Sequence, residues 1–393
     1  MSSYNTIIIG AHYAIDGMNF TNSSQASFDK IYYTLSNIIT WAGLCKYDSN
    51  FDGDKEAIVW SKENIVSFKI NDETDILFYP YRGSQTYQPY SRSMTLTQYV
   101  GIEFTYSKGH TLSQSIEDIQ PIIDLISFAT NQNISIEKME CCNEQTSYYI
   151  QDRKMQNPRK VFLSKAQNLE NEPSYLDILF YLNELTNNGN EYLTNWFNKY
   201  EKLKPIMNLY TAAFKYPEIP IEMHFLNVVQ ALETYHSRFI CDKLKQYKKR
   251  IENILSAVPE EIRNYHLKFL LSDAQEQADY IILKSRLNDL MLAEFKIVFY
   301  NMSREAFPYK FIDKVVDTRH YFTHYSKSKE VKALSGIELI VSCRILRVML
   351  EYYLLKEIGF NQEYINSKIR NRQKYIADYY DEIELSKYKI YDT

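Results

Sequence analysis

Glycine and proline are distributed unevenly along this chain of 393 residues, and that distribution constrains the fold of each half. Seven of the ten glycines lie within residues 1–112, where dipeptides such as Asp16-Gly17 and Asp52-Gly53 separate apolar runs. Such dipeptides form the tight turns that join antiparallel strands. From about residue 173 the apolar residues recur at helical spacing, and no proline follows Pro308. The sequence therefore predicts an α+β chain, with a β-rich domain at 1–165 and an all-α domain at 166–393.

The expected elements follow from the same patterns. In the first domain, alternating apolar residues predict strands over 58–70, 75–81, 98–107 and 137–153. Residues 33–41 fit a strand or a helix. A helix is expected over 116–130, with Ser113 or Ser115 as its cap and Pro121 as a kink or a sign of a later start. In the second domain, helices are expected over 174–188, 190–203, 221–240, 259–271, 275–300, 308–325 and 333–358, with outer helices in 361–393.

The loop at 48–59 has the opening of a calcium-binding loop, because Asp48, Asn50, Asp52 and Gly53 stand at the matching positions. Position twelve of such a loop is a bidentate glutamate, whereas this chain has Val59 there. A strand rather than a helix is also expected to follow. We therefore predict an acidic hairpin turn, with neither a metal site nor a cofactor.

Composition restricts the class of protein. The chain is 45% hydrophobic and 24% charged, as is usual for a soluble globular protein. Its net charge of −4 provides no overall basic field, so any RNA site has to be a local patch. The five cysteines have no regular spacing, which argues against a disulfide framework and a zinc site. Because neither a signal peptide nor a membrane-length apolar run is recognisable, we expect a cytoplasmic protein without a membrane contact.

The stretch from Phe311 to Lys327 holds the side chains best suited to chemistry. Arg319 and His324 are separated by four residues near the end of a predicted helix. A guanidinium grips a phosphate with a planar set of N–H donors, and an imidazole transfers protons near neutral pH. On an ideal helix the two side chains diverge by roughly 140°. They meet on one ligand only if the turn loosens or if a second subunit supplies the missing half.

Three stretches resemble one family of proteins. The run DTRHYFTHY, residues 317–325, resembles the RxxxxH signature of HEPN domains, which are helical bundles that include many metal-independent ribonucleases. The run FLNVVQALETYHSRF, residues 225–239, is similar to the earlier helix of the ApeA-like HEPN branch. The run FDKIYYTLSNIITWAGL, residues 28–44, resembles the β-rich domain that precedes HEPN in ApeA-type phage-defence proteins. The resemblance implies a sensor or regulatory domain followed by a HEPN ribonuclease domain.

The resemblance also implies roles for particular residues. Arg319 and His324 would be the catalytic pair, supported by His320 and by Glu233, whose carboxylate would orient the arginine. HEPN ribonucleases join two such pairs across a two-fold axis, so we expect a homodimer or a higher even oligomer.

The basic segment at 241–250 is either an RNA contact or a solvated face of a helix. Lys248, Lys249 and Arg250, with Lys327 after the motif, are the candidate RNA ligands. Arg344 and Arg347 are further candidates for the same region.

The implied activity is endonucleolytic cleavage of RNA by attack of the ribose 2′-hydroxyl, giving a 2′,3′-cyclic phosphate. The substrate expected is RNA, with tRNA loops as one candidate. A phage protein is the trigger expected at the N-terminal domain. Two alternatives stay open: a non-catalytic HEPN scaffold that binds RNA or dimerises, and an unrelated hydrolase in the N-terminal domain. For the second, the sequence offers neither a nucleophile elbow nor a phosphate loop.

Overall fold

The computed structural model forms two compact units, residues 1–198 and 199–393, and the division falls within helix α4 (Glu191–Lys215). The predicted domain boundary at 165/166 lies outside the described residues and stays a prediction. No helix in the described part of the chain is long and apolar enough to cross a membrane. The structure describes residues 13–18, 20, 26–53, 55–83, 94–163, 173, 178–186, 190–240, 253, 256–257, 259–260, 282–295 and 309–381.

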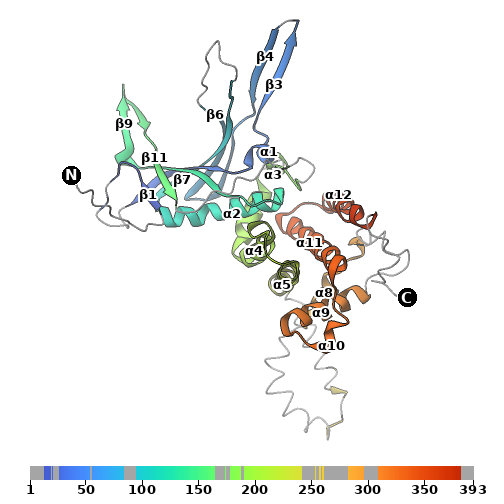
Figure 1. The fold of residues 1–393 in the computed structure, drawn as a ribbon. Helices are drawn as coiled ribbons and strands as arrows, with labels where there is room; N and C mark the ends of the chain where they lie inside the picture. The colour runs from blue at the N-terminus through green and yellow to red at the C-terminus, as the bar shows by residue number, and fades with distance from the viewer. Residues whose placement is uncertain are drawn as a thin grey trace, which may run out of the picture. The chain divides into compact units, whose positions relative to one another are not determined.

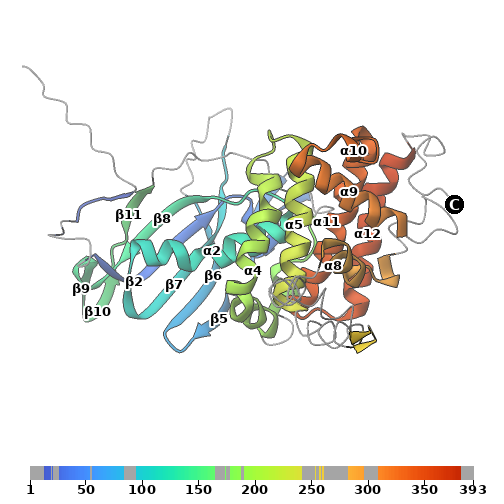
Figure 2. The same cartoon turned by 90° about the horizontal axis from the view of Figure 1, so that it is seen from below.

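The first unit is built on a seven-stranded antiparallel sheet (Figures 1 and 2). Its middle is formed by β2 and β7, which are far apart in the sequence, and buried aromatic residues such as Phe28 and Phe104 fill the core beneath them. In spatial order the strands are β1 (Tyr13–Ile15), β11 (Arg159–Leu163), β8 (Ile136–Cys142), β2 (Ser27–Leu35), β7 (Gln98–Thr111), β6 (Thr74–Arg82) and β5 (Val66–Asn71).

One long helix, α2 (Leu112–Thr130), packs against β2 and β7. Nearly every residue after Ile119 is buried, which explains why the helix continues through Pro121. The N-cap is Thr111 rather than Ser113 or Ser115. Thr111 forms a reciprocal capping box with Gln114, so the helix starts directly at the end of β7.

Two β-hairpins project from this sheet (Figure 1). One consists of β3 (Cys45–Asp52) and β4 (Lys55–Lys62), whose register runs from Cys45 opposite Lys62 to Asp52 opposite Lys55. The prediction of a hairpin turn at Asp52-Gly53 is therefore confirmed, and Gly53 takes the positive φ of 59° that the turn needs. The other consists of β9 (Ser147–Ile150) and β10 (Arg153–Gln156).

Two helix predictions differ from the structure. The segment expected to be helical over 174–188 becomes α3 only at Leu182–Thr186. Ile178, Leu179 and Phe180 precede it as a buried, non-helical strap, and the Leu179 N–H donates to the Ala129 carbonyl at 2.7 Å. Helix α4 in turn extends to Lys215, twelve residues beyond the predicted end, because buried residues continue on both sides of Pro205.

The second unit is helical, as predicted. Helix α11 (Gly336–Ile358) is buried around most of its circumference and packs against both α5 (Ile221–Phe239) and α12 (Gln362–Asp381) (Figure 2). Helix α9 (Tyr309–His324) packs against α5 and against the short α8 (Leu283–Leu290). A four-residue helix, α10 (Lys327–Glu330), follows α9. Together with the sheet of the first unit, this bundle confirms the predicted α+β class.

Candidate active site

The motif residues lie on the last two turns of α9. The helix forms because the adjacent Phe311 and Ile312 are followed at intervals of three by Val315 and Thr318, and all four are at most 1% exposed. This buried stripe fixes the rotation of the helix about its axis. Arg319 follows directly at the edge of the stripe and is half-buried.

The two histidines lie away from the buried stripe. His320 is half-buried, His324 is exposed, and their ring centroids are 4.8 Å apart with an interplanar angle of 57°. They share a face because they are one helical turn apart. Arg319 and His324 are five residues apart on a regular helix, so their side chains leave the axis roughly 140° apart. One chain therefore presents the cation and the imidazole on different faces of α9.

The Arg319 guanidinium is available to a ligand. Within the described residues, none forms an ion pair or a side-chain hydrogen bond with it. Its backbone carbonyl is used, since it accepts the Thr323 hydroxyl at 2.7 Å. Other cations of this region are engaged: Lys329 pairs with Asp317, and Lys284 lies 2.5 Å from Asp313.

The end of α9 is fixed by two local features. Tyr325 adopts a positive φ of 48°, and its N–H donates to the Tyr321 carbonyl at 2.5 Å, which ends the helix directly after His324. The buried Thr318 hydroxyl accepts the Leu334 N–H at 2.8 Å and donates to the Lys314 carbonyl at 2.6 Å. The segment between His324 and Leu334 is thus held against the motif helix.

Two exposed side chains follow His324 on that segment. Lys327 is exposed on α10, as expected for an RNA ligand. Tyr325 is 71% exposed, and its ring lies 5.6 Å from that of Tyr321. Tyr325 is not among the candidates that the sequence patterns indicate, although an aromatic residue directly after the motif histidine is a signal that the sequence carries. Burial and the nearby Glu330 raise the pKa of Tyr321, so its hydroxyl stays protonated at neutral pH.

Glu233 does not pair with Arg319 in this structure. Its side chain is half-buried on α5, and its backbone carbonyl accepts from Arg286 at 3.5 Å. An aromatic contact between α5 and α9 joins Phe225 to Phe322, whose ring centroids are 6.2 Å apart. The predicted orienting role of Glu233 stays a prediction.

The remaining basic candidates divide into two groups. Lys248, Lys249 and Arg250 lie outside the described residues. Arg347, by contrast, is engaged in the core: it lies 3.3 Å from Glu351 and 4.3 Å from the Phe214 ring centroid. The Arg347 guanidinium is therefore engaged with its own chain, unlike that of Arg319, and a contact with RNA stays a prediction.

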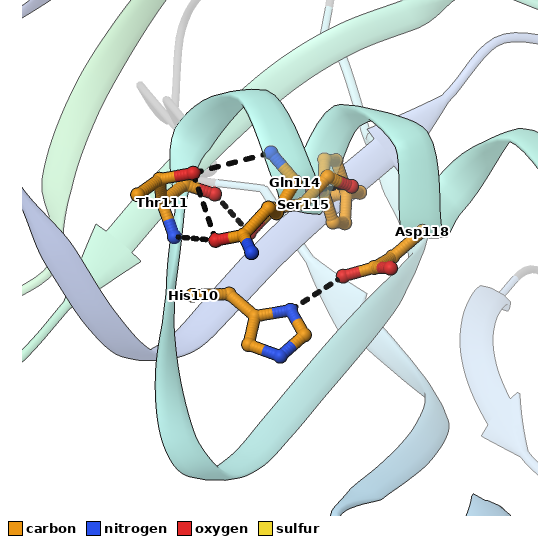
Figure 3. A network of polar contacts seen from close by, with 6 residues as sticks. His110, Thr111, Gln114, Ser115 and Asp118 are labelled. Carbon is orange, nitrogen blue, oxygen red and sulfur yellow. Dashed lines mark hydrogen bonds and ion pairs between the residues drawn. The ribbon is translucent and has the colours of Figure 1, made fainter. Parts of the chain in front are cut away.

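Other histidines have structural partners. His236 is fully buried, and its Nε2 lies 3.1 Å from Asp289. His110 also has a partner, because its Nδ1 lies 2.8 Å from Asp118 (Figure 3). The capping box at Thr111 turns the chain so that the end of β7 meets the second turn of α2, and the His110 ring also stacks on Tyr106. Sequence spacing alone did not show that turn.

Comparison with known proteins gives a match for each unit. Residues 1–196 match the model of ApeA N-terminal domain 1, and residues 226–364 match the Apea-like HEPN model. The second match contains both Glu233 and the Arg319–His324 motif. Neither the curated proteins nor the solved structures gave a match. The chain is therefore an ApeA-like HEPN protein, in which an ApeA N-terminal domain precedes the HEPN domain.

Proposed function

We propose that this protein is a metal-independent endoribonuclease of an anti-phage, abortive-infection system, acting in the cytoplasm. The observation that supports this most is the state of the motif on α9. An arginine without a partner among the described residues and an exposed histidine occupy the RxxxxH positions of a HEPN domain. Family membership alone supports only a defence-associated nuclease, and these two side chains support the more specific activity.

The two side chains divide the reaction between them. Arg319 binds the scissile phosphate and stabilises the negative charge that grows on its oxygens. His324 takes the proton from the ribose 2′-hydroxyl, or supplies one to the 5′-oxygen that leaves. The bond that forms joins the 2′-oxygen to phosphorus, and the bond that breaks releases the 5′-hydroxyl. The products are a 2′,3′-cyclic phosphate and a 5′-hydroxyl, and DNA is inert because it lacks the 2′-hydroxyl.

The helix geometry supports the proposal that a second copy takes part. Because Arg319 and His324 diverge by roughly 140° on α9, one chain directs only one of them at a given phosphate. Two copies related by a two-fold axis place the arginine of each beside the histidine of the other. His320 shares the face of His324 and supports proton transfer there. We infer a homodimer as the active unit.

The surface next to His324 suits single-stranded RNA. Lys327 supplies a cation to the backbone, and the exposed Tyr325 ring supplies a surface on which a base stacks. The segment with Lys248, Lys249 and Arg250 adds charge to the same role. Loops such as tRNA anticodons fit this requirement because their bases are already unstacked. The N-terminal domain acts as the sensor, and a phage protein is the proposed trigger.

The test compares wild-type protein with Arg319→Ala and His324→Ala on total cellular RNA in the presence of a chelator. Each substitution should lower the cleavage rate by about 100-fold or more. Arg370→Ala is the matched control, because Arg370 is an exposed arginine on α12 outside the motif, and it should cleave like the wild type. Equal cleavage by all four proteins would exclude the proposed site, and loss of wild-type cleavage in chelator would indicate a metal-dependent enzyme.

The alternative is a HEPN scaffold that binds RNA or dimerises without cleaving it. A scaffold has no need of both an unengaged guanidinium and an exposed imidazole at the motif positions. If RNA binds with unchanged affinity to wild type and to His324→Ala, and neither protein produces 2′,3′-cyclic phosphate ends, the scaffold is the correct assignment.

A further inference from the structure

The side of the sheet opposite α2 carries aromatic side chains, where an exposed sheet face normally carries polar ones. Tyr33 points toward α2, since its hydroxyl donates to the Ser115 carbonyl at 2.8 Å, so the adjacent Tyr32 points to the opposite side. The pairing of β2, β7 and β6 places three more tyrosines on that side, and all four are half-buried. We call this surface the tyrosine face; it consists of Tyr32, Tyr79, Tyr81 and Tyr99.

The rings of the tyrosine face are held in a row by their neighbours. Tyr81 stacks on Tyr99 with ring centroids 5.1 Å apart, and its ring lies 5.8 Å from that of Tyr79. The hydroxyls of Tyr81 and Thr34 share a hydrogen bond of 2.8 Å. The Tyr79 ring lies against Gly101, where an added Cβ would approach the ring to 2.5 Å, so a side chain at this position would displace it. Rings that are already ordered lose little conformational entropy when a partner covers them.

The charged side chains beside the tyrosine face neutralise one another. Lys30 pairs with Glu103, and Lys138 lies 2.9 Å from Glu140. In the strand register the two glutamates stand on either side of Tyr32. RNA gains affinity from cations that are free to bind its phosphates, and these lysines are already neutralised. Charge complementarity therefore favours an uncharged polypeptide over a nucleic acid.

The surroundings of the tyrosine face suit an extended segment. Beside Tyr79 the same side of the sheet is hollowed, with an open cavity of about 670 Å³ whose lining includes Leu77 and Thr105. At the other end, the Tyr32 hydroxyl donates to Gln156 of β10 at 2.8 Å. The hairpin β9–β10 joins no other strand among the described residues, so its edges offer backbone groups to a further strand. A strand added there would lie beside the tyrosine face.

We propose that the tyrosine face binds an extended, uncharged segment of a partner protein, which packs apolar side chains on the four rings. Tyrosine is among the residues that most often dominate the binding energy of protein interfaces. The identity of the partner rests on the proposed function, in which a phage protein triggers the nuclease through the N-terminal domain. The surface then specifies the chemistry of that trigger, which is strand-forming, apolar and without net charge.

The first test selects binders for the full-length protein from a library of short random peptides. Enriched peptides should be uncharged and rich in apolar residues, and Tyr79→Ala should weaken their binding by about tenfold or more. Gly101→Ala should weaken it as well, because the added methyl group displaces the Tyr79 ring. Tyr148→Ala is the matched control, since Tyr148 is 46% exposed on β9 outside the tyrosine face, and it should bind like the wild type.

Tyr79→Phe distinguishes loss of the surface from loss of the fold. It keeps the ring and removes only the hydroxyl, so it should bind the selected peptide like the wild type, whereas binding as weak as that of Tyr79→Ala would refute the role of the ring. The proposal is also overturned if the enriched peptides are charged, if none is enriched, or if wild type and Tyr79→Ala bind them equally. Binding of polyuridine RNA that is lost in Tyr79→Ala would show that the occupant is a nucleic acid instead.

The second test separates this inference from the proposed function. The selected peptide should raise RNA cleavage by the wild-type protein by about tenfold, within the usual range of coupling between two sites, and a bound peptide that leaves the rate unchanged refutes its role as trigger. If the protein cleaves no RNA under either condition but binds the peptide through Tyr79, the ribonuclease assignment fails and the docking surface stands. If it cleaves RNA and no peptide binds, only the docking surface fails.

Discussion

The buried hydroxyl of Thr318 offers the sharpest test of how the motif region is held in place. Thr318 is fully buried one residue before Arg319, and its hydroxyl accepts the N–H of Leu334, which is 1% exposed. Substituting valine keeps the shape of the side chain and removes the acceptor. The Leu334 N–H is then buried without a partner, while the Lys314 carbonyl keeps its helical backbone bond.

The size of the effect follows from that single lost acceptor. A buried donor left without a partner costs about 1–3 kcal/mol of the free energy of unfolding. For a unit of this size, that corresponds to a fall in melting temperature of roughly 2–12 °C. The cost is local, so amide exchange at Leu334 should accelerate by on the order of 10-fold to 100-fold. Cleavage should also fall, because the segment that carries Lys327 is held less firmly beside His324.

The assay combines urea unfolding with hydrogen exchange of the peptide that contains Leu334. Thr318→Ser is the matched control: it keeps the hydroxyl and loses one buried methyl group, so it should cost about 1 kcal/mol but retain slow exchange at Leu334. The reasoning is refuted if Thr318→Val exchanges as slowly as Thr318→Ser at this amide. It is equally refuted if the valine variant unfolds at the urea concentration of the wild type.

Two further predictions concern the helical unit. Glu351 is 2% exposed and lies 3.2 Å from Arg372 and 3.3 Å from Arg347. Glu351→Gln should therefore lower the free energy of unfolding, measured in urea, by about 3 kcal/mol, because two cations lose their counter-charge. A loss below about 1 kcal/mol would contradict this. Burial, and then the charge of Arg347, lower the pKa of His224 below 6.5. As pH falls below about 6.5, the unfolded state therefore binds a proton at this histidine before the folded state does, and the free energy of unfolding decreases. Between pH 7.5 and pH 5.5 the melting temperature of His224→Gln should fall by less than that of wild type. Equal falls would contradict the prediction.

The motif helix was predictable because local signals and packing agree there. The apolar stripe from Phe311 to Val315 predicted a helix over 308–325, and α9 spans Tyr309–His324. The same agreement holds for β6, predicted over 75–81 and observed at Thr74–Arg82. At these places each side chain prefers locally the conformation that the core also requires.

The differences arise where packing outweighs local preference. The helix predicted over 190–203 continues through Pro205 as α4, because Leu203, Ile206 and Met207 are fully buried. Burial of that much apolar surface exceeds the cost of one lost hydrogen bond. The apolar run before Leu182 has helical spacing, yet it lies as a strap in the core of the first unit. The partner of His110 depends on the turn at Thr111, which places residues of a strand and a helix side by side.

The sequence predicts which side chains of the candidate site would do the chemistry, but it does not predict whether one chain holds the whole site. Spacing places Arg319 and His324 on one helix, and the structure adds that, within the described residues, neither side chain forms a hydrogen bond or an ion pair. The angle between the two side chains supports the proposal that a second copy supplies the group that one chain directs elsewhere. In the proposed dimer, Arg319 of one chain would meet the RNA beside His324 of the other, so the two side chains that one helix holds apart would act on the same phosphate.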